Sequence, residues 1–223
     1  MFKPSSPRFS LHIAFSLVLL ASRLPKPVEA QSGRVPCCGP IAAAFDRLTA
    51  TLDSMHVESL WLAHEHVNWE TGELGMRAGF EREDNHTNCS AFAAAAAKRL
   101  GVYLLRPPEH GQQLLANAQA EWLAGEGGRQ AGWRKASDME KAQRLANEGT
   151  LVLVVYQNPN KHVPGHIAII RPSEKSAKEL NDNGPEVIQA GQHNHARVSV
   201  RIAFESHPGA WPDGVQYYVH SLL

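Results

Sequence analysis

A change of periodicity near Gly149 constrains the fold of this chain more than any other feature. Before Gly149, apolar residues recur at helical spacing, and after it they form short β-branched runs. The pattern predicts helices over 41–66, 90–100, 111–123 and 137–147, and strands over 150–157, 166–171, 186–190, 197–204 and 216–222. Ser137 is expected to cap the fourth helix, with Glu140 at the capping-box position. Helices first and strands second indicate the α+β class, with N-terminal helices packed on an antiparallel sheet.

Residues 1–30 have the features of a secretory signal peptide. Lys3 and Arg8 precede an apolar stretch over 11–22, and Ala30 ends a cleavage site of small residues. The stretch is short for a membrane span, and an uncleaved anchor is the alternative. No later segment stays apolar for roughly 18 residues, so no stable membrane span is expected after cleavage. A periplasmic or secreted protein is therefore predicted.

Beyond the signal segment, we expect a helical lead-in over 31–79 and one domain over 80–223. The chain carries 22 basic and 22 acidic residues, so it has no electrostatic footprint for nucleic acid. Its three cysteines leave at least one thiol without a partner inside the chain. Cys37 and Cys38 have three options: to pair with each other, to pair with another chain, or to form a regulatory disulfide with Cys89.

Cys89 is the leading candidate for a nucleophile. It stands at the start of the helix predicted over 90–100, where the positive end of the backbone dipole favours thiolate over thiol. A lone cysteine is more often a small buried apolar residue, so the case depends on its position.

A base and an orienting group follow on two predicted strands. Alternation places His166 with Ala168 and Ile170 on one face of the strand over 166–171. Gln189 interrupts the next apolar strand, and a hairpin-like return would bring it beside the imidazole. A glutamine can fix the tautomer of a catalytic histidine, although it does not stabilise imidazolium as a carboxylate does. The ordinary alternatives are a structural core histidine and a surface glutamine.

Three short motifs resemble the NlpC family of cell-wall peptidases. The Asn-Cys-Ser-Ala-Phe run over 88–92 is similar to that family's Asp-Cys-Ser-Gly-Phe motif, and Gly-His-Ile-Ala-Ile-Ile over 165–170 resembles its histidine strand. Val-Ile-Gln-Ala over 187–190 is similar to the strand whose histidine orients the catalytic one, and the related CHAP amidases have a like order of elements. The resemblance covers about residues 80–205.

The resemblance implies a papain-like cysteine hydrolase domain over 80–223 that cleaves an amide bond in peptidoglycan stem peptides. Cys89 would attack, His166 would move the proton, Gln189 would orient His166, and the backbone N–H of Cys89 would bind the oxyanion. The chain departs from the family's pattern at Asn88, which stands where the family has an acid that helps to hold the stem peptide in some members. Asn88, Trp69 and His66 are the expected substrate-binding residues, and no cofactor or metal is assigned.

Other functions remain open from the sequence. The histidine clusters at 64–66, 162–166 and 193–195 suggest a zinc-dependent hydrolase, although no Cys-x-x-Cys or His-Glu-x-x-His motif occurs. A second alternative is a catalytically inactive module of the same fold that binds cell wall or a partner protein. Acyl transfer to an amine is a third, because it shares the acyl-enzyme.

Overall fold

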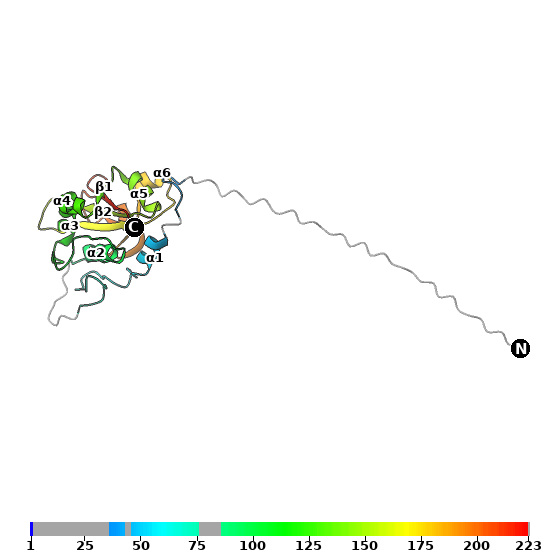
Figure 1. Cartoon of the computed structure of the whole chain (residues 1–223), viewed down its shortest axis with the longest axis horizontal. Helices are drawn as coiled ribbons and strands as arrows, with labels where there is room; N and C mark the ends of the chain where they lie inside the picture. Colours follow the sequence, from blue (N-terminus) through cyan, green and yellow to red (C-terminus); the bar gives the residue numbers. More distant parts are fainter. Residues whose placement is uncertain (2–35, 43–45, 76–85, 223) are drawn as a thin grey trace. The chain divides into compact units, whose positions relative to one another are not determined.

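The structure is a computed structural model that describes residue 1 and residues 36–42, 46–75 and 86–222 (Figure 1). Arg34–Leu223 form one compact unit, separate from Met1–Gly33. The predicted signal peptide lies outside the described residues apart from Met1. In the described part, no helix is both long and apolar enough to cross a membrane.

A six-stranded antiparallel sheet forms the centre of the compact unit, in the order β1-β6-β2-β3-β4-β5. The strands are β1 (Arg134–Lys135), β2 (Leu151–Tyr156), β3 (His166–Ile170), β4 (Glu186–Gln189), β5 (His195–Ser199) and β6 (Gln216–His220). The predicted α+β class is therefore confirmed. The strand predicted over 197–204 is wrong in its second half, because β5 ends at Ser199 and the short helix α7 (Val200–Ala203) follows.

The sheet is covered on both faces, and β3 shows the alternation that the sequence predicts. Ile167 and Ile169 belong to one buried cluster, which includes Phe92 of helix α2 (Cys89–Arg99), whereas Ala168 and Ile170 belong to the other. Figure 1 shows α1 (Asp46–Asp53) and α2 on one side of β2 and α5 (Met139–Asn147) on the other. Since Leu48 and Leu52 of α1 lie in the same cluster as Phe92, the predicted lead-in and domain share one core.

The helices follow the predictions in part. They are α1 (Asp46–Asp53), α2 (Cys89–Arg99), α3 (Leu115–Ala124), α4 (Glu126–Gln130), α5 (Met139–Asn147), α6 (Ala177–Asn183) and α7. The N-cap of α5 is Asp138, whose side chain accepts a hydrogen bond from the N–H of Lys141, so the prediction of Ser137 is wrong by one residue. Helices α4 and α6 were not predicted from the sequence.

The helix predicted over 41–66 is wrong beyond Asp53, where α1 ends. His56, Trp61 and His64 have positive φ angles of 49°, 52° and 64°, which break the helix. The side chain of Asn194 replaces the lost helical bonds, because its Nδ2 donates to the carbonyls of residues 57, 60 and 61 at 2.6, 2.8 and 3.3 Å. Apolar residues at helical spacing here contribute to the core from a loop.

Candidate functional site

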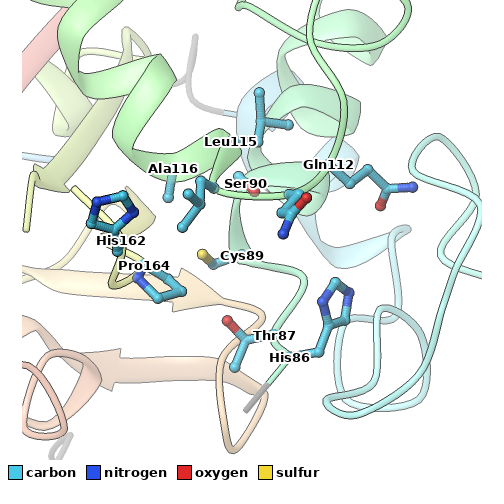
Figure 2. Close-up of a pocket in the computed structure, with 12 residues that line it drawn as sticks. His86, Thr87, Cys89, Ser90, Gln112, Leu115, Ala116, His162 and Pro164 are labelled. Atoms are coloured by element: carbon cyan, nitrogen blue, oxygen red, sulfur yellow. The ribbon is translucent and has the colours of Figure 1, made fainter. Parts of the chain in front are cut away.

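Cys89 is the first residue of α2 and is buried, with 3% of its surface exposed. It lines a cavity of about 320 Å³ together with Thr87, His86, His162 and Pro164, among others. In Figure 2 the Cys89 side chain lies between Thr87 and His86 on one side and His162 and Pro164 on the other. The cavity therefore gives a small group access to the sulfur from a concave surface.

Burial raises the pKa of the Cys89 thiol above its ordinary value. Hydrogen bonds from the backbone of Ile167 and from the hydroxyl of Thr87 favour the thiolate, as do the backbone groups of Ser90 and Cys89 at the helix N-terminus. These contributions are smaller than the effect of burial. The helix N-terminus favours the thiolate as expected, but burial of Cys89 outweighs it in this structure.

His166 and Gln189 lie side by side, and their hydrogen bond defines the proton position on the imidazole. His166 Nε2 and Gln189 Oε1 are 2.5 Å apart. Gln189 Nε2 donates to the carbonyl of His193 at 2.9 Å, which assigns Oε1 to the imidazole. His166 Nε2 is consequently the protonated nitrogen, and Nδ1 carries the lone pair. Nδ1 is buried and has no hydrogen-bond partner among the described residues.

Two aromatic rings enclose the imidazole of His166. His207 stacks on it at a centroid distance of 4.9 Å, and Phe204 meets it edge-on at 4.7 Å. Burial, followed by the influence of His207, lowers the pKa of His166 from 6.5 to about 3, against the hydrogen bond with Gln189. The imidazole is therefore neutral over the physiological range.

Cys89 and His166 open into two neighbouring cavities. The cavity beside His166 has a volume of about 370 Å³ and is also lined by Gln189 and His207. Thr87 and Pro164 line both cavities, so they form the boundary between them. In the described part of the chain, the thiol and the imidazole make no hydrogen bond to each other.

Gly165 allows the hairpin between β2 and β3 to position His166 beside Gln189. A Cβ atom on Gly165 would lie 2.3 Å from the Tyr156 carbonyl oxygen and 2.5 Å from Oδ1 of Asn117. The same Asn117 side chain accepts from the N–H of Asn158 at 3.0 Å and donates to the carbonyl of Val163 at 2.9 Å. Asn117 of α3 thus holds both ends of the hairpin loop, and only glycine fits beside it.

None of the three expected substrate-binding residues lines either cavity, among the residues described. Asn88 is 1% exposed, and its Nδ2 donates to the carbonyls of Leu62 and Glu65 at 2.7 and 3.0 Å. Asn88 thus holds the loop after α1 against the start of α2.

Trp69 and His66 also line neither of the two cavities, among the residues described. Trp69 packs against the core, with the charged ends of Lys98 and Arg106 at 5.4 and 5.8 Å from its ring. His66 stacks on His86 at 5.1 Å, so it supports a residue that does line the cavity of Cys89.

Of the three alternatives for Cys37 and Cys38, the structure shows the disulfide between these two neighbours. Cys37 and Cys38 form a disulfide with each other, and Cys89 is a free thiol. The N–H of Cys37 donates to the carbonyl of Lys175 at 3.0 Å, which attaches this segment to the loop before α6. A regulatory disulfide to Cys89 is absent from this structure.

Neither a metal site nor a related protein helps to identify the function. The described residues contain no group of three or more His, Cys, Asp or Glu side chains arranged to hold a metal ion. No protein-family model matches the chain, and a search of curated proteins finds no match. A function can therefore be inferred only from the geometry of the site and the motif resemblance.

Sequence reasoning missed three residues that shape this site: Thr87, His207 and Asn117. Thr87 stands two residues before Cys89, and this spacing could have drawn attention to it. His207 and Asn117 reach the site only through the tertiary fold, and no local pattern marks either of them.

Proposed function

We propose that this chain is an exported cysteine hydrolase with a papain-like fold that cleaves an amide bond in peptidoglycan stem peptides. The observation that carries the proposal is the chain of hydrogen bonds from the His193 carbonyl through Gln189 to His166. It leaves the His166 lone pair on Nδ1, as a proton acceptor for a thiol needs. The choice of peptidoglycan and the exported location rest on the motif resemblance and on the predicted signal peptide.

In the proposed reaction, Cys89 Sγ attacks the amide carbonyl carbon while its proton passes to Nδ1 of His166. The backbone N–H of Cys89 donates to the oxyanion. The tetrahedral intermediate collapses when His166 returns the proton to the leaving nitrogen, which releases an amine and leaves a thioester on Cys89. Water, activated by the same imidazole, then hydrolyses the thioester and restores the thiol.

Both pKa directions favour a neutral thiol–imidazole pair at rest. The proposed enzyme therefore uses His166 as a general base during the attack rather than a preformed thiolate–imidazolium pair. Closure of the gap between Sγ and Nδ1 accompanies substrate binding in this mechanism, because catalytic hydrogen bonds often tighten only in the substrate complex.

Digestion of purified peptidoglycan tests the proposal, with the wild-type protein beside Cys89→Ala and products identified by mass spectrometry. Stem-peptide fragments are expected from the wild type alone, and their masses name the bond. Cys89→Ala is expected to change the free energy of unfolding by no more than about 1–2 kcal/mol, because it removes one small side chain. Fragments from both proteins would reject Cys89 as the nucleophile.

A catalytically inactive binding module is the second candidate, and one observation favours it. The thiol is buried and makes no hydrogen bond with the imidazole in the described part of the chain. Such a module would sediment with insoluble peptidoglycan yet release no fragment, with Cys89 shown to be reduced. The zinc-dependent alternative finds no ligand group among the residues described.

A further inference from the structure

His207 lies in the turn after α7 and is held there from both sides. Its backbone N–H donates to the carbonyl of Phe204 at 2.9 Å. The hydroxyl of Tyr156, at the end of β2, donates to the carbonyl of Pro208 at 3.0 Å. The turn is therefore fixed to the sheet next to the strand end that carries His166, which pairs with Tyr156 across β2 and β3.

The fixed turn places the ring of His207 nearly parallel to the ring of His166. The two planes differ by 20°, and the edge of Phe204 approaches His166 at an interplanar angle of 72°. Stacking and edge contacts define the plane of the imidazole, and the hydrogen bond to Gln189 defines its rotation within that plane. These contacts leave one orientation for Nδ1.

We propose that His207 is a positioning residue for His166: it stacks on the imidazole, excludes water from it, and keeps it as the tautomer protonated on Nε2. This inference deepens the proposed function and rests on it for the catalytic meaning of that tautomer. His207 also lines the cavity beside His166, so a leaving group in that cavity would contact the stacked pair.

Excluding water from His166 matters for the position of its proton. Gln189 is neutral and does not stabilise imidazolium as a carboxylate would. Without the cover of His207, the ring would turn away from Gln189 and bond to water instead, both neutral tautomers would then become populated, and Nδ1 would lose its defined direction. Burial already dominates the low pKa of His166, and the influence of His207 adds to it.

The test compares His207→Ala with His207→Phe by two readouts. The first is ¹⁵N NMR of the histidine side chains, which distinguishes the two neutral tautomers and the cation, with His166→Gln to assign the signal. In the wild type and in His207→Phe, His166 is expected to stay neutral and protonated on Nε2 from pH 7 to about 5, because both keep a ring over the imidazole. In His207→Ala, the His166 pKa is expected to move back towards its ordinary value, with mixed tautomers.

The second readout is the rate of stem-peptide release from peptidoglycan. We expect His207→Ala to lose about tenfold to a hundredfold in rate, as misplaced catalytic groups do, and His207→Phe to recover most of that loss. His110→Ala is the matched control, because His110 is a partly exposed histidine whose side chain, among the described residues, hydrogen-bonds only to the carbonyl of its neighbour Gly111.

An unchanged His166 tautomer and pKa in His207→Ala would overturn the inference, and so would a wild-type His166 protonated on Nδ1. If the wild type releases no fragments, the proposed function fails, while the NMR comparison still decides whether His207 positions His166. A rate loss in His207→Ala that His207→Phe does not recover would also overturn it, because stacking would not then be the cause.

Discussion

Acidification should destabilise this protein through His166, by an amount that the structure allows us to estimate. The pKa of His166 is about 3 in the folded protein, against an ordinary value of 6.5. Between these pH values the unfolded chain binds a proton that the folded chain does not, so stability rises with pH and is lost as pH falls. The loss is about 1.4 kcal/mol per pH unit below 6.5, about 2 kcal/mol at pH 5, and approaches its full value of about 5 kcal/mol only below pH 3.

The measurement is the free energy of unfolding in urea at pH 7, 6 and 5, for the wild type and for His166→Gln. The glutamine keeps a donor for Gln189 and removes the titration. Carboxylates contribute equally to both proteins, so the difference between their slopes isolates His166. We expect the wild type to lose about 2 kcal/mol more than His166→Gln between pH 7 and pH 5.

Equal slopes in the two proteins would refute the reasoning, since they would mean that His166 is protonated in the folded state as easily as in the unfolded one. Burial also lowers the pKa of His207, which adds a loss in the same direction. The variant His207→Phe separates the two contributions. A slope that persists in His166→Gln and disappears in His207→Phe would assign the acid sensitivity to His207 instead.

Three further outcomes are expected. Alkylation of Cys89 by iodoacetamide should be slow at pH 6 and still accelerate above pH 8, because burial raises the pKa of the thiol; a rate that is already maximal at pH 6 would contradict this. Gly165→Ala should lower the free energy of unfolding in urea by about 1–3 kcal/mol, since its Cβ would overlap Asn117; wild-type stability would show that the hairpin adjusts to the added methyl group. The double variant Cys37→Ser with Cys38→Ser should keep the wild-type rate of stem-peptide release, because the disulfide does not include Cys89; a gain in rate would point to a regulatory bridge.

The sequence predicted the sheet well where apolar runs are uninterrupted. β2, β3 and β4 lie within one or two residues of their expected bounds, because strands covered on both faces are continuous apolar runs between polar turns. Gln189 was found by the same rule, as a polar residue in an apolar strand, and it does contact His166. Local pattern is informative here because one residue spacing decides which face a side chain occupies.

The loop after α1 shows where such reasoning fails. Its apolar residues repeat at rough helical spacing, but its carbonyls are bound by the side chains of Asn194 and Asn88. These partners are more than twenty residues away in the sequence, so no local window contains them. The ionisation state of Cys89 could not be predicted for a related reason. The helix N-terminus is visible in the sequence, whereas the burial that outweighs it is not.

Because Cys89 and His166 are both neutral at rest, the proposed enzyme develops its charges only when Cys89 attacks a substrate. Burial disfavours both thiolate and imidazolium, and Gln189 offers the imidazolium no counter-charge. When Cys89 attacks a carbonyl, an oxyanion forms at the N-terminus of α2 while His166 becomes positive, and each charge then has an opposite partner in a site of low polarity. The attraction exists only once the tetrahedral centre develops, so it stabilises the transition state more than the bound substrate. The same burial that makes Cys89 a poor thiolate at rest thereby restricts its reactivity to a substrate that fits the site.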